Sequence, residues 1–308
     1  MKGEKSLAKA GKFMKVLVSG STGLIGSELI PYLNRNGYAT QRLVRGSATG
    51  DVRWDPEAGT IEKEKLNTID AVVHLAGENI AAGRWNEERK KKILESRVKG
   101  TKLLAESLAA LTTSPKVMIC ASASGYYGDR GEEILREDSS PGTGFLTDVC
   151  KEWEAAAEPA RQKGIRVVHV RIGILLTPKG GALGKMIRPF KLGVGGRLGS
   201  GKQYWSWIAI DDLLRVIEFA LTTDPIQGPV NTVTPNPVTN AEFTRTLSKV
   251  LRRPAIFPAP AVALKLALGE MAQELLLSSF RMEPARLISS GFVFHYPELE
   301  GALHHVLS

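Results

Sequence analysis

The sequence predicts an α/β fold of the Rossmann type: a doubly wound parallel sheet followed by a smaller C-terminal substrate-binding region. Short β-branched runs alternate with longer amphipathic segments as far as residue 176, and a glycine-rich turn follows the first of these runs. Beyond residue 176 this alternation gives way to Gly-rich and then Pro-rich stretches. We therefore expect a flexible extension over 1–13, a Rossmann core over 14–176 and a C-terminal region over 177–308, in which 203–233 returns to the core sheet.

The core strands are short runs rich in valine, isoleucine and leucine, bounded by turn residues. They are expected at Lys15–Ser19, Thr40–Val44, Ala71–Leu75, Val117–Ala121 and Arg166–Leu176. Apolar residues recur with helical spacing over 91–111, and a second helix is expected over 148–163. Past residue 176, the pattern predicts a strand at 207–210, a helix at 212–221 and a strand at 230–233.

Composition excludes several classes of protein. With 43% hydrophobic and 24% charged residues, the chain resembles an ordinary globular protein, and no run of eighteen apolar residues predicts a membrane span. We therefore expect no membrane partner. The first thirteen residues lack the apolar core of a secretory signal, and two cysteines suit a reducing cytoplasmic location. Five histidines without ligand spacing, and no CxxC, predict no metal site.

The chain is basic, with a net charge of +9. Such an excess attracts nucleic acids, but it also suits a phosphorylated cofactor or substrate. The sequence contains no helix-turn-helix signature and no aromatic RNA-binding motif, so no nucleic-acid partner is expected. A small phosphorylated molecule is the favoured partner.

The strongest motif is VLVSGSTGLIGSEL at residues 16–29, in which a strand runs into a glycine-rich turn and then a helix. Gly20 suits the tight turn, Gly23 the close approach of a pyrophosphate, and Gly26 the packing of helix on strand. Free N–H groups at the start of the helix would hold the phosphates. The motif predicts a dinucleotide site formed by Gly20, Thr22, Gly23, Leu24, Ile25 and Gly26.

The end of the second strand indicates which dinucleotide is bound. NAD-binding sites commonly carry an acidic residue there, which holds the ribose 2′-hydroxyl. Here Arg45 occupies that position and Arg42 lies nearby. A cation favours the 2′-phosphate of NADP, although a solvated surface arginine is the alternative. NADP is therefore the expected cofactor in preference to NAD.

Taken together, these motifs resemble the extended short-chain dehydrogenase/reductase superfamily, and more narrowly its atypical, NAD-dependent epimerase-like branch. The resemblance covers residues 14–308. Its segments are GSTGLIG (20–26), HLAGENI (74–80), RWNEERKKKILESR (84–97), ASASGYYG (121–128), GSGKQYWSWIAIDDL (199–213), NPVTNAEF (236–243) and GFVFHYPELEGAL (291–303).

The resemblance implies further cofactor contacts. It places Leu75, Ala76 and Gly77 under the adenine ribose. It also places Lys92 and Arg97 near the phosphates and ribose, where a solvated helix face is an equal alternative. Backbone around Leu175 would lie beside the nicotinamide, unless it is a plain core strand.

The resemblance also implies a catalytic serine and a Tyr-x-x-x-Lys helix. Ser122 matches the serine and Lys151 the lysine, but Thr147 stands where the tyrosine is expected. A threonine hydroxyl is too weak an acid to replace the tyrosine. Tyr126 and Tyr127 are the nearest substitutes, unless both rings pack against cofactor or core.

Two functions remain open from the sequence. The first is an NADP-dependent oxidoreductase or epimerase acting on a small carbonyl or nucleotide-sugar substrate. The second is a non-catalytic NADP sensor or partner-binding protein that has lost the Tyr-x-x-x-Lys chemistry. Since members of the superfamily are commonly dimers, a homodimer is also expected.

Overall fold

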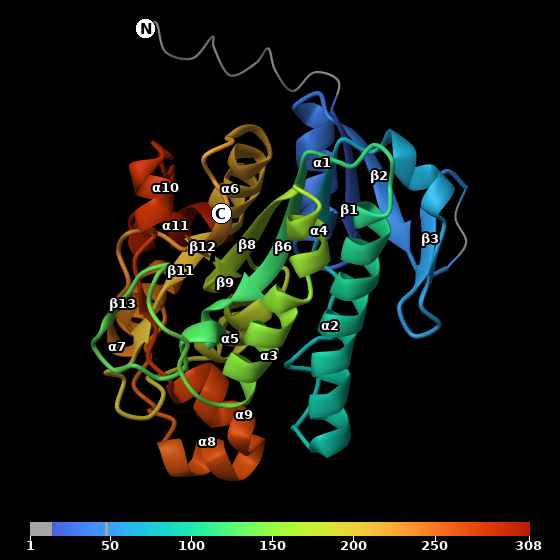
Figure 1. Ribbon diagram of the computed structural model, residues 1–308. Helices are drawn as coiled ribbons and strands as arrows, with labels where there is room; N and C mark the ends of the chain where they lie inside the picture. The colour runs from blue at the N-terminus through green and yellow to red at the C-terminus, as the bar shows by residue number, and fades with distance from the viewer. Residues whose placement is uncertain (1–13, 47–48) are drawn as a thin grey trace, which may run out of the picture.

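A parallel eight-stranded sheet forms the centre of the computed structural model, which describes residues 14–46 and 49–308 (Figure 1). The expected extension over 1–13 lies outside the described residues. The strand order is β12-β8-β6-β5-β1-β2-β3-β4, and only β4 pairs in the antiparallel direction. The predicted Rossmann-type α/β class is therefore confirmed. These strands span β1 Lys15–Ser19, β2 Ala39–Val44, β3 Val52–Asp55, β4 Thr60–Ile61, β5 Ala71–His74, β6 Val117–Ala123, β8 Arg166–Ile172 and β12 Gly228–Thr232.

Helices cover both faces of this sheet, because both faces of a parallel sheet are apolar and must be buried. Helices α1 (Gly26–Arg35) and α6 (Ile210–Thr222) pack on one face through a core that includes Leu29, Leu33 and Ile217. The long helix α2 (Glu87–Ala109) and the short α4 (Glu158–Gln162) cover the other face, with Leu104 and Ala160 in its core. Helix α3 (Phe145–Ala155) lies beside α2 (Figure 1).

Two predicted elements are interrupted in the structure. The expected strand Arg166–Leu176 divides into β8 and β9 (Ile174–Leu176), and β9 pairs with β11 outside the main sheet. Gly173 allows this break, because a Cβ there would lie 2.4 Å from the carbonyl oxygen of Ser206. The expected helix over 148–163 divides into α3 and α4, with Pro159 inside the first turn of α4.

The C-terminal half builds a second, smaller core. Trp205, Trp207 and Phe243 are fully or almost fully buried there, with side chains from α5, α7 and α11 around them. The remaining elements are the short helix η2 Lys63–Thr68, η3 Ser124–Tyr127, β7 Ile134–Leu135, α5 Gly181–Lys191, β10 Tyr204–Trp205, β11 Trp207–Ala209, β13 Val238–Thr239, α7 Asn240–Leu251, α8 Ala261–Leu268, α9 Glu270–Ala272, the π-helix η4 Gln273–Leu277, β14 Arg281–Met282, α10 Ala285–Ser289 and α11 Leu299–Leu307.

Candidate functional site: a dinucleotide cradle and a buried polar network

The glycine turn between β1 and α1 is packed too closely for side chains. Gly20 has a φ of +65°, and a Cβ there would lie 2.8 Å from the Leu75 carbonyl carbon. A Cβ on Gly26 would lie 2.3 Å from the carbonyl oxygen of Gly20, so α1 approaches the turn at backbone distance. This geometry leaves the N-terminus of α1 open toward the carboxyl edge of the sheet, as phosphate binding requires.

A series of buried, hydrogen-bonded side chains supports the loop after β5. Ser19 Oγ accepts the backbone N–H groups of Leu75 (3.0 Å) and Ala76 (3.2 Å), and lies 2.7 Å from His74 Nδ1. The His74 Nε2 lies 3.0 Å from Thr101 Oγ1 on α2. Since Ser19 Oγ already accepts two hydrogen bonds, its own O–H donates to His74 Nδ1. The imidazole is therefore the tautomer that carries its hydrogen on Nε2. Ser19 and His74 thus fix the loop that borders the glycine turn.

A cavity of about 450 Å³ opens between the glycine turn, the end of β2 and the loop after β5. This volume is within the range of cofactor sites. Seven of the thirteen predicted cofactor residues line it: Gly20, Thr22, Gly23, Arg45, Leu75, Ala76 and Gly77. Gly26 lies buried behind the turn. The structure therefore brings most of the predicted cradle around one hollow.

The two arginines of β2 differ in their surroundings. Arg42 donates two hydrogen bonds to Asp51, at 3.1 and 2.6 Å, and these raise the pKa of the guanidinium. Arg45 is exposed, lines the cavity and forms no ion pair within residues 14–46 and 49–308. Of the two cations, only Arg45 is available to an anionic ligand.

The β3–β4 hairpin contributes one wall of the cavity, which the motifs did not predict. Its lining residues are Trp54, Asp55, Pro56 and Glu57. The sequence carries a signal for it: apolar and charged residues alternate along β3, and a proline follows the strand directly. Ser21, Leu43, Val44, Glu78 and Ser96 also line the cavity and were not predicted.

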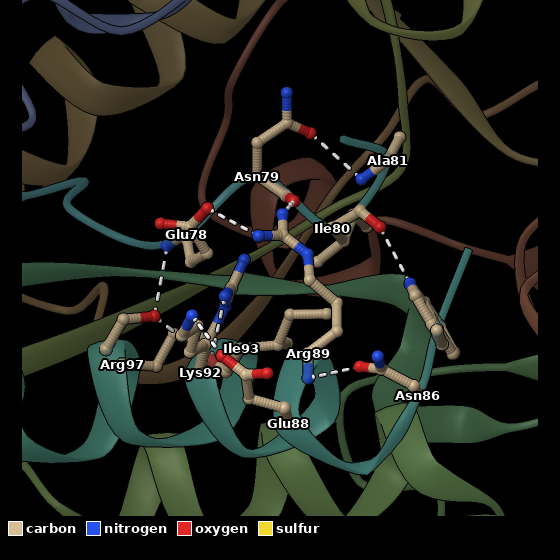
Figure 2. A network of polar contacts seen from close by, with 12 residues as sticks. Glu78, Asn79, Ile80, Ala81, Asn86, Glu88, Arg89, Lys92, Ile93 and Arg97 are labelled. Atoms are coloured by element: carbon tan, nitrogen blue, oxygen red, sulfur yellow. Dashed lines mark hydrogen bonds and ion pairs between the residues drawn. The ribbon is translucent and has the colours of Figure 1, made fainter. Parts of the chain in front are cut away.

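Helix α2 holds the loop after β5 through the polar network of Figure 2. Arg89 donates to Glu78 Oε1 at 2.8 Å and to the carbonyl of Asn79, while Glu78 N–H donates to Ser96 Oγ at 3.0 Å. These contacts fix the chain that follows Gly77. Arg89 is a further residue of this region that the motifs did not single out.

The two predicted cations of α2 lie in different environments. Arg97 is packed against Gly77, where a Cβ would lie 3.3 Å from its Cζ, and it stacks on Trp153 at 5.0 Å. Burial lowers the pKa of the Arg97 guanidinium. Lys92 is largely exposed and pairs with Glu88 at 2.6 Å (Figure 2). Neither side chain lines the cavity, so both cofactor roles stay predictions.

The other predicted cofactor residues lie around the cradle. Leu24 packs against Gly180, where a Cβ would lie 3.1 Å from Leu24 Cδ1. Ile25 is the N-cap of α1 and packs on the core, as does Leu175 of β9. Their contacts with a cofactor stay predictions.

The predicted catalytic serine lies within a strand, because β6 continues to Ala123. Ser122 is buried on the face covered by α3, and its hydroxyl donates to Glu154 Oε1 at 2.7 Å. Arg171, its register partner on β8, donates two hydrogen bonds of 2.8 Å to the same carboxylate. Burial raises the pKa of Glu154, but the hydrogen bonds and charge of Arg171 outweigh it and hold that pKa below its usual value.

The two tyrosines of the loop differ in access. Tyr127 is fully buried, and its hydroxyl contacts Asn231 Oδ1 at 2.6 Å and Arg171 Nη1 at 2.9 Å. Burial raises the pKa of Tyr127 to about 12. Tyr126 is half-buried, lies edge-on to Tyr127, and has the Arg171 Cζ 3.4 Å from its ring centroid. Among the described residues, no hydrogen bond engages the Tyr126 hydroxyl.

Helix α3 directs other residues than Lys151 toward β6. Lys151 is half-exposed and lies 3.9 Å from Asp148. Thr147 is buried and donates to the carbonyl of Gly125 at 2.9 Å. The positions that contact β6 are Cys150, whose Sγ lies 3.9 Å from the Ala123 carbonyl, and Glu154, while Leu146 packs against Gly125 of η3. This helix face carries no phenol and no ammonium group.

The described part of the chain contains no group of three or more His, Cys, Asp or Glu side chains placed to hold a metal ion. Within the same residues, no helix combines the length and the apolar composition that a membrane crossing needs.

Buried His74 predicts acid sensitivity. Burial lowers its pKa from 6.5 to about 4, so only the unfolded chain takes up this proton between those pH values. Stability should therefore fall as the pH drops through that window, by about 2 kcal/mol between pH 7 and 5 from His74 alone. Urea unfolding at both pH values measures it. His74→Gln should lose about that much of the pH dependence. An unchanged pH dependence in His74→Gln would refute the assignment.

Comparison with known proteins agrees with this geometry. The family model described as "NAD dependent epimerase/dehydratase family" matches residues 16–232, and a domain of unknown function, DUF1731, matches 259–306. Epimerase family protein Mb2239 of Mycobacterium bovis is 41% identical over 94% of this chain and 96% of its own.

Two solved structures are also similar over most of the chain. The crystal structure of human epimerase family protein SDR39U1 (isoform 2) with NADPH superposes with a TM-score of 0.89, at 36% identity, over 95% of this chain and 99% of that one. A nucleoside-diphosphate sugar epimerase from Corynebacterium glutamicum gives 0.79 at 39% identity, over 96% of this chain and 58% of that one. The resemblance drawn from the motifs is confirmed: the chain belongs to the NAD-dependent epimerase/dehydratase family, within the extended short-chain dehydrogenase/reductase type.

Proposed function

We propose that this protein binds NADP(H) and uses it in an oxidoreductase or epimerase reaction on a small substrate. The observation that carries the cofactor assignment is Arg45, an exposed cation without an ion pair in the described chain, on the rim of the glycine-lined cavity. A guanidinium matches the geometry and charge of a phosphate. The NADPH in the human relative's crystal structure supports the same choice.

The residues fit a dinucleotide in a definite order. Gly20, Thr22 and Gly23, with the N-terminus of α1 behind them, would bind the pyrophosphate through backbone N–H groups. Leu75 to Gly77 would border the adenine ribose, and Arg45 would bind its 2′-phosphate. Arg97, packed on Gly77, would contribute positive charge from the α2 side.

Tyr126 is our candidate proton donor and acceptor. NADPH, when bound, supplies hydride at its nicotinamide C4. The Ser122 hydroxyl donates a hydrogen bond to Glu154, and Tyr127 is fully buried. Both are therefore less free than Tyr126 to exchange a proton with a substrate. The Tyr126 hydroxyl is not engaged within the described residues, and the Arg171 guanidinium lies 3.4 Å from its ring centroid.

A non-catalytic NADP sensor is the second candidate. It is favoured by the α3 face toward β6, where Cys150 and Glu154 offer neither a phenol nor an ammonium group. On this alternative, Tyr126 would only pack against its neighbours, which include Val233 and Met282.

The substrate would lie under the C-terminal region over 177–308, which we propose as the substrate-binding part. The Corynebacterium relative is described as a nucleoside-diphosphate sugar epimerase, and this supports a nucleotide-sugar substrate. Simple carbonyl compounds are the other class to test.

Turnover separates the two candidates. A panel of carbonyl compounds followed by NADPH oxidation at 340 nm, and a panel of nucleotide sugars incubated with NADP and analysed for epimerised product, should together find at least one substrate, since an epimerase leaves its cofactor unchanged overall. Tyr126→Phe should then lower kcat about 100-fold or more, as loss of a general acid does. Tyr204→Phe is the matched control, since Tyr204 also carries an arginine over its ring, at 4.8 Å. If a protein that binds NADPH turns over no member of either panel, the sensor assignment is correct.

A further inference from the structure

The C-terminal region exposes a set of large apolar side chains that no part of the described chain covers. More than half of the surface of each is exposed. They come from the loop after α5, from the chain before α8 and from α8 itself. We call this set the apolar ridge: Leu192, Val194, Ile256, Phe257, Val262 and Leu266.

Two chain segments of the apolar ridge run side by side. Phe257 N–H donates to the Gly195 carbonyl at 3.3 Å, and Gly199 N–H donates to the Ala259 carbonyl at 2.8 Å. A Cβ on Gly196 would lie 1.9 Å from the carbonyl oxygen of Phe257, so the two backbones touch. The chain then enters α8, in which no residue is buried. Figure 1 shows α8 at the lower end of the molecule, outside the layers that cover the sheet.

The chain segments that form the apolar ridge carry only positive charge. No aspartate or glutamate occurs between residues 159 and 210, or between 243 and 269. The exposed cations of these stretches that form no ion pair in the described chain include five that lie near the ridge in the sequence: Arg188, Lys191, Arg252, Arg253 and Lys265. Arg253 also donates to the Lys191 carbonyl at 3.3 Å, so the cations at the end of α5 lie next to those that follow α7.

Charge decides between the partners that could cover such a surface. A second copy of this chain would bring the same cations to the interface, and each copy carries a net charge of +9. An anionic surface complements them instead. Apolar side chains rimmed by lysine and arginine are the composition with which peripheral helices enter the interface of acidic bilayers.

We propose that the apolar ridge docks this protein on the surface of bilayers containing acidic phospholipids. This inference goes beyond the proposed function and concerns α8, where the DUF1731 match begins. The expectation of no membrane partner rested on the lack of a spanning segment, which peripheral docking does not need. The ridge would insert its side chains between lipids while the five cations contact headgroup phosphates.

Vesicle sedimentation tests the proposal on the full chain. At about 0.1 M salt, binding to phosphatidylcholine vesicles with about 30% phosphatidylglycerol should exceed binding to pure phosphatidylcholine at least tenfold, since each cation near an acidic surface contributes. The double variant Phe257→Ser/Leu266→Ser should bind about tenfold or more weakly. Val293→Ser, which changes an equally exposed apolar residue elsewhere, should bind like the parent. NADPH titration confirms that each variant is folded.

Three results would overturn the proposal. The first is no preference for the acidic vesicles, and the second is equal binding by the double variant and Val293→Ser. The third is a dimer in sedimentation velocity that the double variant dissociates, because the ridge would then be an interface between copies. Binding to soluble polyglutamate but not to vesicles would likewise replace the bilayer with an acidic protein partner.

Discussion

Replacing Arg171 with methionine is expected to cost about 3–5 kcal/mol of unfolding free energy at pH 7, because it leaves a buried carboxylate without its partner. Arg171 is only 2% exposed and binds Glu154 through two hydrogen bonds of 2.8 Å. Its third contact, to the Tyr127 hydroxyl, would also be lost. Urea unfolding measures the change.

The Arg161–Glu158 pair provides a matched control. Arg161 also makes two hydrogen bonds to one carboxylate, but its side chain is 69% exposed. Solvent screens exposed pairs and they contribute little, so Arg161→Met should be nearly neutral. The double variant Arg171→Met/Glu154→Leu should recover much of the loss, since no charge is then left buried. An Arg171→Met variant as stable as Arg161→Met would contradict the importance of this network.

Replacing Arg45 with aspartate is expected to weaken NADPH binding about 100-fold and to change NADH binding only a few-fold. Charge-assisted hydrogen bonds contribute about 1.5–3 kcal/mol each, and about 2.8 kcal/mol corresponds to 100-fold in affinity. NADH has no 2′-phosphate to lose. Fluorescence titration of both nucleotides measures the two constants.

Arg42→Gln is the control for this substitution, because Arg42 is already paired with Asp51 and does not line the cavity. It should keep the preference for NADPH. If Arg42→Gln lost the preference for NADPH and Arg45→Asp kept it, the residue that binds the 2′-phosphate would be Arg42 and not Arg45.

The glycine turn and the strand ends around the cavity could be placed from the sequence, because backbone geometry determines them. Glycines are needed wherever a Cβ would strike another backbone, and at Gly20 and Gly26 such contacts occur. The ends of β1, β2 and β5 follow from runs of apolar residues, and parallel strands bring these ends together. The positions of Arg45 and Leu75 beside the cavity follow from the same rule.

The surroundings of the catalytic candidates could not be predicted, because they depend on register and on helix rotation. β6 continues two residues beyond the expected Ala121, and alternation along the strand then directs Ser122 under α3. The rotation of α3 decides whether Lys151 or Cys150 faces β6, and a motif match does not give it. The pairing of Arg42 with Asp51 likewise joins β2 to the residue before β3, a contact that no motif contains.

The central claim is that the cavity at the glycine turn binds NADP(H) and that Arg45 binds the 2′-phosphate of this cofactor. Titration of the unaltered protein with NADPH and with NADH under the same conditions tests this most directly. The account predicts that NADPH binds about 100-fold more tightly, by the energies given above for Arg45. Equal affinities for the two nucleotides, or no binding of either, would contradict it.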